Sequence, residues 1–184
     1  MPIGISMNVL LHSCCGPCAS ACVPRLQDDG HTVTMFFSNS NIDTRAEYEK
    51  RLAAARKLAS AEGVELVADA YDHADWLREV AAGYEREPEK GRRCERCYRY
   101  NLARTAFYAA AHGFEAFTTS LTVSPHKPSA KIFASSEDPK FLREDFKKRE
   151  GFKLSVHRAG ELGLYRQTYC GCEFSKRTSR EEPA

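Results

Sequence analysis

The sequence predicts an α/β fold in which a mostly parallel sheet carries helices on both of its faces. Short apolar runs rich in β-branched and aromatic residues alternate with longer, charged segments that have helical spacing. Glycine and proline stand between several of these segments, where they end helices or open turns. Strands that alternate with helices join into a parallel sheet, because each helix carries the chain back across the sheet.

The predicted elements follow one another in a regular order along the first two thirds of the chain. Strands are expected at Asn8 to Ser13, Thr32 to Phe37, Val64 to Ala68 and Ala116 to Ser120. Helices are expected at Pro17 to Asp28, Thr44 to Glu62, Asp75 to Ala82 and Cys94 to His112. Pro17 suits a first helical position, and Gly63 suits a helix stop.

The part of the chain after Ser124 is less regular. We expect a loop that contains proline and serine, a helix near Pro139 to Arg149, and a tail that bears cysteines. Residues from Arg177 onward are polar and are expected to fray. The 184 residues contain no internal repeat or low-complexity linker, so we expect a single domain over residues 1–184 with its core at about residues 8–175.

Composition narrows the class of protein. The longest uncharged runs are too short to cross a bilayer, and the N-terminal segment lacks the basic residues and cleavage site of a secretory signal. The sequence therefore predicts a soluble, cytoplasmic protein with no membrane partner. Its net charge is only +2, although basic residues are in excess after Ser124. Eight grouped cysteines in a reducing compartment indicate metal or redox chemistry.

Two cysteine pairs form a candidate metal site. Cys14 and Cys15 follow the first predicted strand, where ligands collect in open α/β sheets. Cys94 and Cys97 form a C-x2-C pair at a helix start, where residues three apart share one face. The four thiolates would suit an iron–sulfur cluster or zinc, and spacing does not decide between them. The alternative for Cys14 and Cys15 is that both are small buried side chains.

A third group is Cys170-Gly171-Cys172. Gly171 removes the steric restriction that would keep two cysteines two positions apart from approaching each other. A disulfide between them would close a small, strained ring that is easily reduced, which favours a redox-active pair. Metal ligation and chemically inert cysteines are the alternatives.

Three further residues lie near the first pair. Cys18 lies one helical turn beyond Cys15 and is a candidate ligand of a second, accessory metal ion. Cys22 is expected in the core. His12 is expected to be a hydrogen-bonded core residue, with metal ligation or a hydrogen bond to a ligand as the alternative.

Several basic residues are candidates for contact with nucleic-acid phosphates. The stretch from Thr118 to Lys127 is rich in hydroxyl groups and ends in a lysine, a composition that suits either a polar ligand or an ordinary loop. Lys127 and Arg166 are the residues that we single out. The remaining basic residues suit a solvated surface equally well: Lys131, Arg143, Lys147 and Lys148.

Four motifs carry a resemblance over about Val9 to Ser175. They are L-L-H-S-C-C-G-P-C, G-R-R-C-E-R-C-Y, T-T-S-L-T-V-S-P-H-K and Y-R-Q-T-Y-C-G-C-E-F-S. In this order and spacing they resemble the epoxyqueuosine reductase QueH family. The resemblance implies a Rossmann-like parallel sheet of the adenine-nucleotide α-hydrolase (HUP) type with a cysteine-bearing C-terminal extension. It does not imply ATP use, and the sequence has no P-loop motif.

The resemblance also implies a reaction and its cofactors. The reaction is the two-electron removal of the epoxide oxygen from epoxyqueuosine in the anticodon stem-loop of tRNA, giving queuosine and water without cobalamin. Cys14, Cys15, Cys94 and Cys97 would hold a [4Fe-4S] cluster, and Cys170 with Cys172 would form the redox-active disulfide. We expect the cluster to relay electrons from an unidentified donor, while an open metal position or an adjacent second metal ion, iron, binds the epoxide oxygen as a Lewis acid.

Two other functions use the same cysteines. In one, zinc stabilises a tRNA-binding protein that has no catalytic activity. In the other, the chain is a cluster-dependent tRNA sulfur transferase that uses ATP, and the missing phosphate loop argues against it. Visible colour separates a cluster from zinc.

Overall fold

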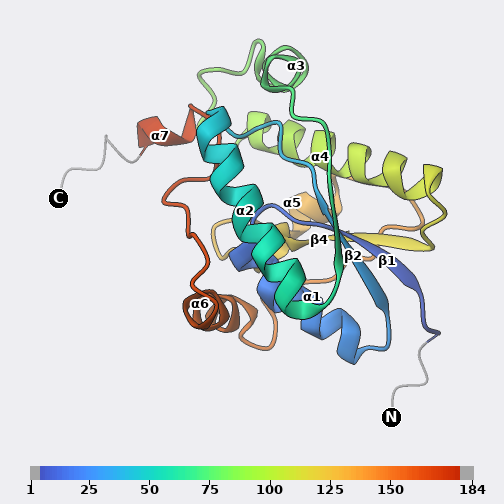
Figure 1. Ribbon diagram of the computed structural model, residues 1–184. Coiled ribbons are helices and arrows are strands. Elements are labelled where there is room, and N and C mark those ends of the chain that lie inside the picture. Colours follow the sequence, from blue (N-terminus) through green and yellow to red (C-terminus); the bar gives the residue numbers. More distant parts are fainter. Residues whose placement is uncertain (1–4, 179–184) are drawn as a thin grey trace.

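The computed structural model describes residues 5–178 and is built on a four-stranded sheet (Figure 1). The strands are β1 (Asn8–His12), β2 (Thr32–Phe37), β3 (Glu65–Ala68) and β4 (Ala116–Thr119). They lie in the order β3-β2-β1-β4, and every neighbouring pair is parallel. The predicted parallel sheet is confirmed, and each strand ends within one residue of its predicted limits.

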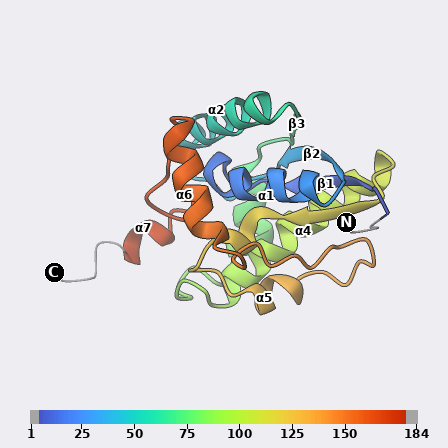
Figure 2. The same ribbon diagram turned by 90° about the horizontal axis from the view of Figure 1, so that it is seen from below.

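Helices cover both faces of this sheet (Figure 2). One face carries α1 (Gly16–Asp28), α2 (Arg45–Glu62) and α6 (Gly151–Glu161), with α1 packed between the other two. The opposite face carries α4 (Arg92–Ala111) and the short helix α5 (Ser129–Phe133). The predicted helices on both faces are therefore confirmed.

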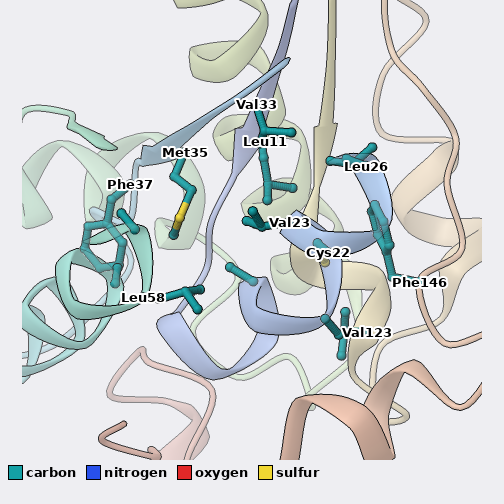
Figure 3. Close-up of a cluster of buried hydrophobic side chains, with 14 of the residues drawn as sticks. Leu11, Cys22, Val23, Leu26, Val33, Met35, Phe37, Leu58, Val123 and Phe146 are labelled. Carbon is teal, nitrogen blue, oxygen red and sulfur yellow. The ribbon is translucent and has the colours of Figure 1, made fainter. Parts of the chain in front are cut away.

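Side chains that alternate along the strands divide the core into two parts. Leu11, Val33 and Met35 point toward α1, where Cys22 lies fully buried among them (Figure 3). On the other face, Leu10 and Phe36 belong to a second apolar cluster with residues of α4. The expectation that Cys22 is a core residue is confirmed.

Local chemistry sets the ends of two helices that matter for the site. The Thr44 hydroxyl accepts the Glu47 N–H at the start of α2, and Gly63 ends that helix with a φ of 65°. At α1 the capping group is a sulfur atom, because Cys15 Sγ accepts the Cys18 N–H at 3.4 Å. The start of α1 therefore depends on a cysteine.

The helix expected at Asp75 to Ala82 begins earlier and changes its winding. Asp72 caps α3 (His73–Trp76) by accepting the Asp75 N–H at 2.9 Å. The chain then continues directly as a π-helical turn, η1 (Leu77–Ala81). Such turns occur frequently at functional sites. This one follows directly on the buried Trp76.

The prediction of a helix at Pro139 to Arg149 is wrong. This segment is extended or turned: Phe141 forms a parallel bridge with Phe117, and the Leu142 N–H donates to the Phe117 carbonyl at 2.8 Å. The open edge of β4 needs backbone partners, and this segment supplies them. A helix follows instead at α6, which the sequence did not predict.

The remaining segments are short. A 3-10 turn, η2 (Ser120–Val123), follows β4, and α7 (Ser175–Thr178) includes the first two residues of the tail that was expected to fray. The rest of that tail, residues 179–184, lies outside the described part of the chain. Between residues 5 and 178 no helix combines the length and the apolar character that crossing a membrane requires.

Two glycines of α6 give a matched test of this packing. A Cβ atom on Gly151 would overlap the Phe146 carbonyl, whereas a Cβ on Gly160 would have no neighbour within 4 Å. We expect Gly151→Ala to lower the free energy of unfolding by about 1–3 kcal/mol or more. Gly160→Ala should be neutral or stabilise by about 1 kcal/mol, because alanine is the better helix former. Denaturant unfolding of both variants measures this, and equal effects would contradict the packing of α6.

Candidate functional site

Three cysteine sulfurs gather where β1 ends and α1 begins. The Sγ atoms of Cys14, Cys15 and Cys18 all lie within 4.8 Å of one another, and Cys15 is 1% exposed. Because β1 and β4 are parallel neighbours, the residue after each strand emerges at the same edge of the sheet. Ser120 accepts the Cys14 N–H at 3.0 Å and donates its hydroxyl to Cys14 Sγ at 3.2 Å.

The three thiols differ in acidity. Hydrogen bonds from Cys14 and Cys18 hold the pKa of Cys15 well below its usual range. Contacts with Cys14 and Cys15 raise the pKa of Cys18 well above its usual range. Of the three sulfurs, Cys15 is the one at which a thiolate is most favoured, because it lies at the N-terminus of α1 and accepts the Cys18 N–H.

The second cysteine pair begins α4. Burial raises the pKa of Cys94 to about 11, and burial also raises the pKa of Cys97 well above its usual range. Electrostatic interaction with Cys170 and Cys172 raises the pKa of both thiols further, so the C-terminal cysteines lie near this pair. Cys94 and Cys97 do not belong to the group of three sulfurs at β1, although Cys14 and Cys94 contact the same apolar cluster.

Each sulfur of the four predicted ligands accepts a hydrogen bond from the protein. The donors are the Ser120 hydroxyl for Cys14, the Cys18 N–H for Cys15, the Lys90 N–H for Cys94 at 3.3 Å and the Asn101 amide for Cys97 at 3.8 Å. Cys22 behaves differently, because its thiol donates to the Cys18 carbonyl. Donors directed at sulfur stabilise thiolates, so these four residues fit a group that binds thiolate ligands.

The cysteine-bearing tail returns to this edge of the molecule. Gly171 adopts a φ of 153°, and a Cβ atom there would lie 2.9 Å from Asn41 Nδ2. Its carbonyl accepts the Asp43 N–H at 2.9 Å. Glycine is therefore required for the close approach of this segment to the loop after β2.

A single cavity of about 590 Å³ connects the tail to the first cysteines. Cys15, Cys18 and Cys170 line it, together with Lys127 and Arg166. Electrostatic interaction with Cys170, and to a smaller extent with Cys14 and Cys18, raises the pKa of Lys127, although burial opposes this. Between residues 5 and 178, no hydrogen bond or ion pair engages Lys127 Nζ or the Arg166 guanidinium. Both cations remain available to a ligand in the cavity.

Comparison with known proteins agrees with this arrangement. The family model described as "Epoxyqueuosine reductase QueH" matches residues 9–178. A protein of that name from Dehalococcoides mccartyi is 36% identical over 92% of this chain and 92% of its own length. One from Thermotoga maritima is 35% identical over 96% and 94%, respectively. The chain belongs to the epoxyqueuosine reductase QueH family.

Similarity to solved structures gives information about the fold alone. The NMN synthetase of Francisella tularensis aligns with 97% of this chain and 79% of its own, with a TM-score of 0.50 and 8% sequence identity. This similarity confirms the α/β fold with a parallel sheet.

In this QueH-family chain His12, a candidate metal ligand, has a structural role. His12 is fully buried, and its ring nitrogens contact the Ser38 carbonyl at 3.0 Å and the Thr119 hydroxyl at 2.9 Å. The carbonyl can only accept, so Nε2 carries the proton and Nδ1 accepts from Thr119. Burial lowers the pKa of His12. The expected hydrogen-bonded core histidine is confirmed.

Three of the other basic candidates have partners for their side chains within the protein. Lys131 pairs with Glu95 at 2.7 Å, and Lys147 donates to the Ser129 hydroxyl at 2.6 Å. Arg143 donates to the Ser136 carbonyl at 3.3 Å. These contacts occupy the three side chains, so they support the interpretation as surface structure. Lys127 and Arg166 differ from them in lining the cavity.

The sequence interpretation missed Arg51, which holds the tail in place. Arg51 is 1% exposed and donates to the carbonyls of Cys170 at 2.8 Å and Tyr169 at 3.2 Å, while pairing with Glu47 at 2.8 Å. Its spacing from Tyr48 places it on the apolar face of α2, which is the signal that could have revealed it.

Removal of Arg51 should detach the tail. Arg51→Met leaves Glu47 without its buried partner, and we expect a loss of about 3–5 kcal/mol in the free energy of unfolding. Faster alkylation of Cys170 should accompany that loss. The control is Arg45→Met, because Arg45 pairs with Glu49 on the exposed side of the same helix, and it should cost less than about 1 kcal/mol. Equal losses in the two variants would contradict the role of Arg51.

Proposed function

We propose that the chain is an oxidoreductase that converts epoxyqueuosine in tRNA to queuosine. In this reaction both C–O bonds of the epoxide break, a C=C bond forms between the two carbons, and the oxygen leaves as water. The change consumes two electrons and two protons. Membership of a family named for this reductase supports the proposal, as does a cavity in which thiols stand beside free cations.

The residues that would hold a [4Fe-4S] cluster are Cys14, Cys15, Cys94 and Cys97. The hydrogen bonds directed at their four sulfurs support this assignment. The cluster, when bound, supplies electrons one at a time from an external donor. We propose Cys18 as a ligand of an accessory iron, because its sulfur lies within 4.8 Å of two of these ligands.

Cys170 and Cys172 form the proposed redox pair. A dithiol that becomes a disulfide releases two electrons and two protons, which is the amount that one epoxide requires. Cys170 lines the cavity, so this sulfur is the member of the pair nearest to a bound substrate. Arg51 holds its carbonyl and thereby fixes its position.

Lys127 is the proposed contact to the substrate oxygen or to a phosphate. Electrostatic interaction with the neighbouring cysteines raises the pKa of Lys127, and its ammonium group has no protein acceptor in the described part of the chain. Arg166, at the edge of the same cavity, would contact the tRNA backbone. An anticodon loop already presents unstacked bases, so no duplex has to be opened. This substrate places the enzyme in the cytoplasm.

The reaction itself is the first test. Protein purified without oxygen should be brown, contain iron and sulfide, and convert epoxyqueuosine tRNA to queuosine with a chemical reductant. Cys170→Ser should keep the colour and lose turnover. Full turnover by that variant would remove the pair from the chemistry, and a colourless, inactive, zinc-loaded protein would favour the structural zinc site.

Lys127→Met tests the contact in the cavity. The loss of one charge-assisted hydrogen bond should weaken tRNA binding or kcat/KM by roughly 10- to 100-fold. If the partner is a phosphate, the slope of log K against log salt should fall by about 0.7. Lys57→Met is the control, because Lys57 is exposed on α2, where it donates to the Gly163 carbonyl. Unchanged binding, turnover and slope in Lys127→Met would contradict the assignment.

A further inference from the structure

Trp76 carries a buried hydrogen-bond donor that lacks an acceptor. The side chain is 1% exposed, and its Nε1 has no hydrogen-bond partner among residues 5–178. An unpaired N–H in a dry environment costs about 1–3 kcal/mol. The large majority of buried polar atoms in native proteins have partners, so this exception calls for an acceptor that binds there.

The surroundings of the indole contain sulfur. Trp76 belongs to an apolar cluster with Val80, Ala81 and Cys172, and Cys97 packs against the same cluster. A neutral thiol is a weak acceptor, whereas a thiolate is a strong one. Trp76 therefore lies beside groups that would accept its N–H only after losing a proton.

Stacked rings fix the orientation of the indole. The His73 ring lies parallel to it with centroids 5.5 Å apart, and Tyr71 stacks on His73. His73 is itself held, because Nδ1 contacts the Ser40 carbonyl at 2.8 Å and Nε2 contacts Glu173 at 3.3 Å. The donor is thus preorganised and cannot turn toward solvent without disrupting these contacts.

Cys97 is the better acceptor of the two neighbouring cysteines. Burial dominates and raises the pKa of Cys97, but Trp76 acts on it in the opposite direction by favouring the thiolate. The Asn101 amide approaches the same Cys97 sulfur from its own helix at 3.8 Å. The Asn101 amide and the Trp76 indole therefore come from different elements and lie beside the same cysteine.

We propose that Trp76 is a positioning residue whose indole N–H donates to the metal-bound thiolate of Cys97 and raises the reduction potential of the group that this thiolate holds. The inference depends on the assignment of Cys97 as a cluster ligand in the proposed function. Reduction adds negative charge to the ligand sulfurs, so a donor at sulfur stabilises the reduced state more than the oxidised state. Ligation would keep Cys97 as a thiolate and so supply an acceptor for the Trp76 N–H.

The reduction potential of the reconstituted protein tests the proposal. Trp76 is the only tryptophan in the chain, so the whole protein can be labelled with benzothienylalanine, which keeps the shape of the indole and replaces N–H with sulfur. We expect a lower midpoint potential, with the ratio of reduced to oxidised protein at a fixed potential falling roughly tenfold, the equivalent of one charge-assisted hydrogen bond.

Two variants separate the donor from packing. Trp76→Phe should lower the potential as the isostere does. Val80→Ala, which alters the same apolar cluster and keeps the N–H, should leave the potential unchanged. A potential that stays at the wild-type value with the isostere would overturn the proposal, as would an equal fall in Val80→Ala.

A second measurement needs neither iron nor turnover. The single indole gives one ¹H–¹⁵N resonance, which should move downfield when the protein is loaded with Zn²⁺ alone. Cys97→Ser should abolish the shift, and Cys172→Ser should preserve it. A resonance that does not respond to zinc, or one whose shift survives Cys97→Ser, would overturn the proposal. Neither readout uses epoxyqueuosine, so a failure here is distinguishable from a failure of the reductase assignment.

Discussion

The site depends on the reciprocal hydrogen bonds between Cys14 and Ser120. These residues are more than a hundred positions apart, yet the parallel pairing of β1 with β4 brings both to the same edge of the sheet. The serine hydroxyl accepts the backbone N–H of Cys14 and donates to its sulfur. One side chain thus fixes the turn after β1 and supplies a donor to a candidate metal ligand. The neighbouring Cys15 sulfur caps α1 and so helps to hold the start of this helix beside the same turn.

A buried charge makes the tail part of this site. Burying a guanidinium costs several kcal/mol unless it is fully paired, and Arg51 is satisfied only by Glu47 together with two carbonyls of the tail. Release of the tail would leave donors of that cation unpaired. This penalty keeps Cys170 at the cavity without a covalent bond, which leaves its sulfur free for the proposed redox role.

Much of this arrangement could be predicted from the sequence. Alternating strands and helices gave the parallel sheet, because hydrophobic period and turn residues act locally. The helix placed at Pro139 to Arg149 was wrong because the demand for backbone partners at the edge of β4 is not local. Cys14 and Cys15 were recognised by their place after a strand. Arg51 and Trp76 were missed, since their importance comes from burial beside segments distant in the chain.

The cysteines show most clearly what could not be predicted from the sequence. The chain places Cys18 beside Cys14 and Cys15, as helical spacing suggested. Cys94 and Cys97 lie outside that group, and Cys170 and Cys172 influence them electrostatically. The most direct test of the proposed centre is an anaerobic crystal structure with diffraction data collected at the iron edge. We expect iron bound by Cys14, Cys15, Cys94 and Cys97 beside the cavity that Cys170 lines. Iron held by Cys14, Cys15 and Cys18 alone, with Cys94 and Cys97 unligated, would contradict the assignment.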